Sequence, residues 1–151
     1  MSDNKSLAKV ADKYVTFEVA KERYATEALR VHSIIRLGTV TRLPGAHETL
    51  LGFVNVRSAI IPLICLRRLF GLPPKEATRE TRVIVIERGN KFQGMLVDRV
   101  LDVLEIDDVE EIDGVSVPVE VDQSFFSSFF RCEEQTYALM DVNSLLASVL
   151  G

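Results

Sequence analysis

Short stretches in which apolar and polar side chains alternate recur along the chain, and a period of two residues is typical of half-buried β-strands. The clearest stretch is YVTFEVA at residues 14–20, where valine and phenylalanine alternate with Thr16 and Glu18. Residues 81–100 predict two strands joined by a turn at Gly89 and Asn90. Further strands are predicted at residues 102–106 and, as a hairpin that turns near 133–135, at residues 124–141.

Two stretches favour helices. From Thr26, a candidate N-cap, apolar side chains follow at helical spacing as far as Ile35, which predicts a short helix. The end of the chain predicts a second short helix, capped by Asp141 or Asn143. Short strands at close spacing, without alternation of strands and helices, favour an all-β barrel fold. Loops are predicted at residues 42–52 and in the acidic stretch 105–113.

The composition is that of a single globular domain. The chain has 151 residues, 47% of them hydrophobic and 26% charged, with a formal net charge of −4, and chains of this length fold without disulfides or metals. Residues 1–12 predict a flexible polar tail before one domain at 13–151. The tail lacks the apolar core of a signal peptide, no apolar run is long enough to span a membrane, and Cys65 and Cys132 form no CxxC pair. We therefore expect a cytoplasmic protein with free thiols and no direct membrane insertion.

Residue types that build catalytic and metal sites are scattered. The phosphate-binding glycine motifs and the HExxH zinc motif are missing from the sequence. The only histidines, His32 and His47, have no cysteine partner nearby, and the acidic stretch fails as a calcium loop because Val109 would take its first ligand position. Cys132, which follows Arg131, is the better candidate for a reactive thiol than the other cysteine. We expect no enzymatic activity, no metal and no cofactor, and we favour a binding module.

Nucleic acid is disfavoured as a ligand on grounds of charge, because the net charge is negative and basic residues do not cluster in the sequence. The phenylalanines of FFSSFF at residues 125–130 are of the type that stacks on bases. Since no basic residues are interleaved with them, core packing is their expected role.

The segment FVNVRSAIIPLICLRRLFGLP at residues 53–73 has the pattern of a buried strand but contains two polar residues, Asn55 and Arg57. Strand alternation puts this pair on one face and Val54 and Val56 on the other. Burying an unpaired guanidinium would cost several kcal/mol, so we expect Arg57 to be exposed at a hairpin tip. Asn55 is expected to fix the turn by bonding to the backbone. From the residues alone, an ordinary turn arginine is the simpler interpretation of Arg57.

The same segment resembles the CheW family, the bacterial chemotaxis coupling proteins. The family pattern is a glycine, an Asn-aliphatic-Arg-Gly turn, an aliphatic-Pro run, and then Asp-Leu-Arg and Phe-Gly-Leu. Residues 81–106 also resemble the family in a hairpin with Val-Asp-x-Val and a following Asp-Val-Leu, and the likeness extends more loosely over about 14–150. The positions that match in the central segment are Gly52, Asn55, Val56, Arg57, Ile60, Pro62, Leu66, Arg67, Phe70 and Gly71.

The resemblance implies two five-stranded, SH3-like barrels packed side by side, with a C-terminal helix. It also implies a non-catalytic adaptor that bridges the cytoplasmic tip of chemoreceptors, the methyl-accepting chemotaxis proteins, to the regulatory domain of the histidine kinase CheA. Carried over by position, the receptor-binding residues are Val31, Asn55, Val56 and Arg57. A helix lying in an apolar groove with one charged anchor at its rim suits this set.

Three positions depart from the family pattern. Ser33 stands where the family often has Glu, Ser58 where the turn has Gly, and Cys65 where Asp precedes Leu-Arg. Because a non-glycine residue seldom adopts a positive φ, we expect a negative φ at Ser58 and a shifted turn. The departures leave two alternatives open: a regulatory CheW-like module of a divergent, pilus or surface-motility type of pathway, or an SH3-like peptide-binding module.

Overall fold

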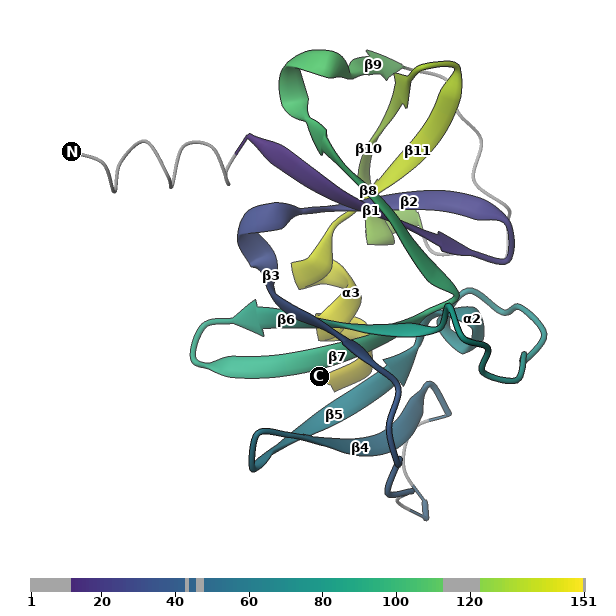
Figure 1. Ribbon diagram of the computed structural model, residues 1–151, viewed down its shortest axis with the longest axis vertical. Coiled ribbons are helices and arrows are strands. Elements are labelled where there is room, and N and C mark those ends of the chain that lie inside the picture. Colours follow the sequence, from purple (N-terminus) through teal and green to yellow (C-terminus); the bar gives the residue numbers. More distant parts are fainter. Residues whose placement is uncertain (1–11, 43, 46–47, 113–122, 151) are drawn as a thin grey trace.

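The computed structural model describes residues 12–42, 44–45, 48–112 and 123–150 (Figure 1). The described residues are mostly β-structure, as the sequence predicts, with a few short helices. The strands are β1 (Lys13–Val19), β2 (Glu22–Glu27), β3 (Val31–Arg36), β4 (Leu50–Val56), β5 (Ala59–Cys65), β6 (Arg82–Arg88), β7 (Lys91–Val97), β8 (Arg99–Glu105), β9 (Glu110–Ile112), β10 (Phe126–Cys132) and β11 (Gln135–Met140). The helices are α2 (Leu66–Leu69), α3 (Val142–Leu150) and the 3₁₀ turns η1 (Ala28–Arg30), η2 (Ile106–Asp108) and η3 (Gln123–Phe125).

The strands form two sheets that divide the chain discontinuously. The middle of the chain forms a five-stranded sheet in the order β3-β6-β7-β5-β4. Strands from both ends of the chain form a six-stranded sheet in the order β8-β1-β2-β11-β10-β9. We call these the central barrel and the terminal barrel. The two-barrel prediction is confirmed, although the terminal barrel gains a sixth strand, β9, from the acidic stretch that predicted a loop.

Closure of the central barrel depends on a close backbone contact between its two edges. Beyond β3, Thr41 exchanges two backbone hydrogen bonds of 2.8 Å with Phe53 of β4. Gly52 makes this approach possible, because a Cβ at that position would collide with the Thr41 carbonyl oxygen and because its φ of 148° suits glycine. The predicted loop at residues 42–52 therefore ends in the strand that closes the barrel.

The sheet of the terminal barrel curls because its two edge strands follow one another directly in the sequence. The edges of its sheet are β8 and β9, and only η2 and its flanking residues connect them. A connection this short requires the two edges to approach each other, so the sheet cannot stay flat. The acidic residues of this stretch are therefore displayed along the barrel edge.

One hydrophobic core fills the space between the barrels. Figure 1 shows α3 lying between the two sheets, and its Leu145 and Leu146 are fully buried there. The same core contains Phe17 of the terminal barrel and Ile84 and Met95 of the central barrel. Burying side chains of this size contributes about 1.5–3 kcal/mol each to stability. As predicted, Asp141 caps α3, since its Oδ1 accepts a 3.2 Å bond from the Ser144 amide.

A partly buried ion pair joins the barrels at their edge. Arg67 of α2 donates to both carboxylate oxygens of Asp98, over 2.9 and 2.6 Å, and Asp98 also accepts a 2.9 Å bond from the Ala20 amide in the β1–β2 turn. Burial alone would raise the pKa of Asp98, but the bonds from Arg67 and Ala20 outweigh it and hold that pKa below its usual value. Arg67, which follows β5 of the central barrel, is thus connected through Asp98 to the β1–β2 turn of the terminal barrel.

The helix predicted from Thr26 to Ile35 is wrong. Thr26 lies buried in β2 and caps no helix, η1 is a single 3₁₀ turn, and residues 31–36 form β3. In β3 the half-buried residues alternate with exposed ones, but Ile34 is on the exposed side, which hides the period of two. Antiparallel pairing with β6 decides the conformation. The predicted tail before residue 12, His47 and Gly151 lie outside the described residues.

Candidate functional site

The tip of the β4–β5 hairpin carries the motif that the sequence singles out. Arg57 and Ser58 form its two-residue turn, with φ angles of 49° and 70°. Positive φ at both central residues is the type I′ turn, whose twist matches that of the flanking strands. The predicted negative φ at Ser58 is therefore wrong, because the twist of the hairpin outweighs the local preference of serine. Ala20–Lys21 and Glu133–Glu134 make the same kind of turn.

Arg57 is exposed at this tip, as predicted. Its guanidinium forms neither an ion pair nor a hydrogen bond with any of the described residues. A planar, permanently charged group with free donors is suited to a carboxylate on another molecule. The side chain is therefore available for an intermolecular contact and contributes nothing visible to the turn.

The predicted backbone bond of Asn55 does not form. Asn55 is exposed, and across the described part of the chain its side chain has no hydrogen-bond partner. The turn needs no such bond, because the paired residues Val56 and Ala59 on either side hold it in the antiparallel ladder. Asn55 therefore belongs to the exposed surface of the hairpin and has no structural role in its turn.

Ile60 is the residue that the sequence reasoning missed. The apolar run assigns it to a buried strand, yet its side chain is 74% exposed, and it lies directly across from Asn55 in the β4–β5 register. A signal was present: a two-residue turn at Arg57 and Ser58 pairs Asn55 with Ile60, so both must face the same side. We call Asn55, Arg57 and Ile60 the hairpin surface.

Val56 and Val31 are not part of this surface. Both side chains are half-buried: Val56 packs in the core of the central barrel with Phe92, while Val31 begins β3 and packs on the core between the barrels. Phe92 also contacts the His32 ring, with ring centroids 4.6 Å apart. The four predicted residues thus occupy one end of the central barrel, where Figure 1 shows the β4–β5 and β6–β7 hairpins ending on the same side.

The remaining candidates for chemistry are packed into the fold. Cys132, the better candidate for a reactive thiol, is buried, as is Cys65. Burial, followed by the charges of Glu133 and Asp108, raises the pKa of the Cys132 thiol, which disfavours the reactive thiolate. Phe125 and Phe130 are buried, which confirms core packing for the aromatic segment. No group of three or more metal-ligating side chains occurs within the described residues, and none of their helices is long and apolar enough to span a membrane.

Known proteins are similar to this chain in sequence and architecture. Residues 13–150 match the CheW-like domain family. The chemotaxis protein CheW of Bacillus subtilis is 30% identical over 139 residues, covering 91% of this chain and 88% of that protein, and the Klebsiella aerogenes chemotaxis protein CheW is 27% identical over 139 residues, covering 92% and 84%. The crystal structure of the scaffolding protein TtCheW from Thermoanaerobacter tengcongensis superposes with a TM-score of 0.79 at 25% identity, covering 90% of this chain and 92% of that one. The chain belongs to the CheW-like domain family.

Proposed function

We propose that this protein is a non-catalytic, cytoplasmic adaptor that couples the cytoplasmic tip of chemoreceptors to the regulatory domain of the histidine kinase CheA. The observation that carries the proposal is the hairpin surface. It presents a largely exposed isoleucine and an arginine that has no partner among the described residues, both on a hairpin with a two-residue turn in a family scaffold.

The hairpin surface has the chemistry needed to hold a helix. Ile60 supplies an apolar anchor that gains free energy only when another molecule covers it. Arg57 lies at the rim, where it can bind a carboxylate or helix-terminal carbonyls and so fix the register of the helix. Arginine is one of the residue types most enriched in binding hot spots.

A bridge must hold both partners at once, so the kinase contact has to lie elsewhere. The terminal barrel exposes Val103 of β8, at 57%, and Ile106 of η2, at 39%. In the family the kinase regulatory domain shares the double-barrel fold, which favours an apolar barrel-to-barrel joint of this kind. We assign the kinase contact to this edge and the receptor contact to the hairpin surface.

Co-sedimentation of the purified protein with a receptor-tip fragment and with the kinase regulatory domain tests the proposal. We expect Arg57→Glu to remove the receptor and keep the kinase, because the two surfaces are on different barrels. Val103→Glu is the matched variant, and it should remove the kinase and keep the receptor. Loss of kinase binding in folded Arg57→Glu protein contradicts separate surfaces, and failure of the unaltered protein to bind either partner contradicts the proposed function.

A further inference from the structure

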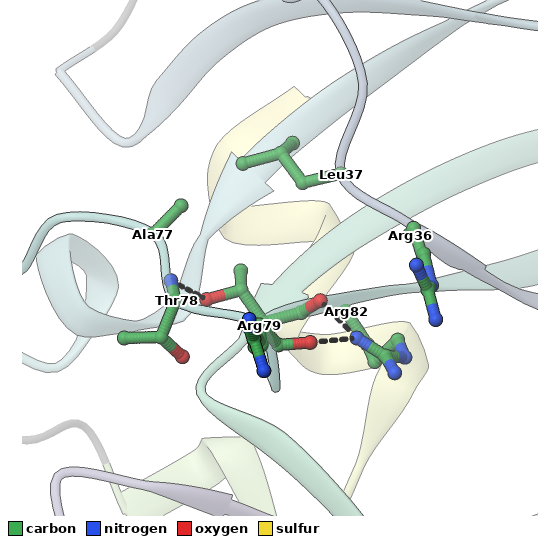
Figure 2. A pocket seen from close by; sticks show the side chains of 7 residues that line it. Arg36, Leu37, Ala77, Thr78, Arg79 and Arg82 are labelled. Carbon is green, nitrogen blue, oxygen red and sulfur yellow. Dashed lines mark hydrogen bonds between the residues drawn. The ribbon is translucent and has the colours of Figure 1, made fainter.

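A hollow of about 430 Å³ opens at the end of the central barrel away from the hairpin surface. The end of β3 contributes Arg36 and Leu37, and the segment that enters β6 contributes the other walls (Figure 2). Its lining residues are Arg36, Leu37, Ala77, Thr78, Arg79, Thr81 and Arg82. We call this the arginine hollow.

The charges in the arginine hollow are all of one sign. Its lining contains three arginines and no carboxylate. None of these guanidiniums forms an ion pair with a described residue, and the nearby Glu80 carboxylate lies 3.4 Å from Arg99 instead. In a protein with a net charge of −4, this is a local concentration of unneutralised positive charge.

The register of the sheet makes this concentration unfavourable for the fold. Arg36 of β3 and Arg82 of β6 are direct partners across the antiparallel pair. Like charges at directly opposed positions destabilise a sheet. An arrangement that opposes stability and has no counter-charge is expected where an external anionic group completes the site.

The walls of the arginine hollow are ordered by their own hydrogen bonds. Nη1 of Arg82 donates to the carbonyl oxygens of Arg79 and Thr81, over 2.7 and 2.8 Å. The Thr78 amide donates to Oγ1 of Thr81 over 2.8 Å, and Oγ1 of Thr78 accepts from the Glu80 amide over 3.2 Å. Figure 2 shows these bonds among the lining residues, so the loop and the Arg82 guanidinium are ordered before any ligand arrives, while Arg36 and Arg79 keep their donors free among the described residues.

We propose that the arginine hollow binds an acidic segment of a partner protein, in which two or more Asp or Glu side chains engage Arg36, Arg79 and Arg82. Guanidinium and carboxylate form bidentate hydrogen bonds, and threonine hydroxyls in the lining complement a peptide backbone. A single phosphate would fill only a small part of the volume. Nucleic acid is disfavoured because the acidic edge at residues 105–111 of the terminal barrel would repel its backbone.

Such a contact suits a scaffold because it can strengthen the binding of a partner that is already held at a second surface. Exposed arginine–carboxylate pairs are individually weak. A partner already held by the hairpin surface or by β8 presents its acidic segment at high effective concentration, so a weak second contact increases the total affinity strongly. The inference does not depend on which partner the hairpin surface binds.

Calorimetric titration with a synthetic hepta-glutamate peptide at about 50 mM NaCl tests the proposal. The double variant Arg36→Gln/Arg79→Gln should bind the peptide about tenfold more weakly. The control Arg88→Gln/Lys91→Gln removes the same charge from exposed positions at the far end of β6 and β7, and should bind as the unaltered protein does. Raising NaCl to about 300 mM should weaken binding to the unaltered protein.

Four outcomes overturn the proposal. The first is that the two double variants bind the peptide with equal affinity, and the second is that the protein binds pyrophosphate but not the peptide. The third is that a single-stranded RNA oligomer binds more tightly than the peptide. The fourth is that the protein self-associates in a way that depends on Arg36 and Arg79. The melting midpoint of Arg36→Gln gives an independent check, because removing the repulsion between Arg36 and Arg82 should leave it unchanged or higher. A marked fall would show that these arginines serve the fold.

Discussion

Arg57 and Arg67 lie in the same 53–73 segment and both match the family pattern, yet the structure places them in opposite surroundings. Arg57 is exposed at a hairpin tip and has no partner in the described part of the chain. The Arg67 side chain is 15% exposed and binds both oxygens of Asp98. One motif thus contains an arginine that is free to bind another molecule and an arginine that holds two barrels together.

The difference comes from the position of each arginine relative to strand β5. Arg57 is the first residue of the two-residue turn before this strand, so it lies beyond the paired residues of the sheet. Arg67 lies after β5 has entered the core, in α2, where Asp98 and the β1–β2 turn converge on it. The roles of these two arginines therefore depend on their distance from the contact between the barrels and not on their residue type.

The largest expected effect is on stability at the ion pair. Arg67→Ala should lower the free energy of unfolding by about 3 kcal/mol, because it leaves the largely desolvated Asp98 carboxylate, 14% exposed, without its guanidinium. Denaturant unfolding measures this. The neighbouring Arg68→Ala removes one exposed bond to the Glu48 carbonyl and should change stability by less than about 0.5 kcal/mol. If Arg67→Ala and Arg68→Ala lowered the unfolding free energy equally, the ion pair with Asp98 would not be the reason for the effect of Arg67.

The same ion pair should appear in the pH dependence of stability. The folded pKa of Asp98 is lowered from 3.8, so its contribution is present above the unfolded pKa and is lost as the pH falls through the folded value. The difference in unfolding free energy between the unaltered protein and Asp98→Asn should therefore shrink below about pH 4. Denaturant melts at a series of pH values measure it, and a difference that stays constant into acid would contradict the ion-pair assignment.

A smaller effect is expected at the turn beside Arg57. Ser58→Gly should raise the free energy of unfolding by about 1 kcal/mol, because glycine adopts the observed φ of 70° without steric strain. Ala59→Gly is the control, since Ala59 is in β5 and glycine there should lower stability by about 0.5–1 kcal/mol. Thermal melts of both variants decide the sign. A destabilised Ser58→Gly would mean that serine stabilises the turn in a way its φ does not reveal.

The smallest stability effect is expected at Asn55. Because its side chain is exposed and has no hydrogen bond to a described residue, Asn55→Ala should change the unfolding free energy by less than about 0.5 kcal/mol. Denaturant melts check this directly. A loss above about 1 kcal/mol would restore the backbone bond that the sequence predicted and the structure lacks.

The all-β fold and most strands could be predicted from alternation, and the family pattern supplied the two-barrel arrangement. The helix at residues 26–35 failed because exposed Ile34 obscures the period of β3, which only pairing with β6 reveals. Ile60 was missed because an apolar run favours a buried strand. The sign of its exposure lies in the turn, which pairs Ile60 with the polar Asn55 across the hairpin. The Arg67–Asp98 pair and the arginine hollow join residues far apart in the sequence, and single-sequence patterns carry no information about such pairs.

The central claim is that Arg57 binds a partner and does not support the fold. A titration of Arg57→Ala with a receptor-tip fragment, run beside a denaturant melt of the same sample, tests it most directly. We expect binding weaker by about 1–4 kcal/mol and an unfolding free energy within about 0.5 kcal/mol of the unaltered protein. Unchanged receptor affinity, or a strongly destabilised variant, would contradict the claim and leave Arg57 an ordinary turn residue.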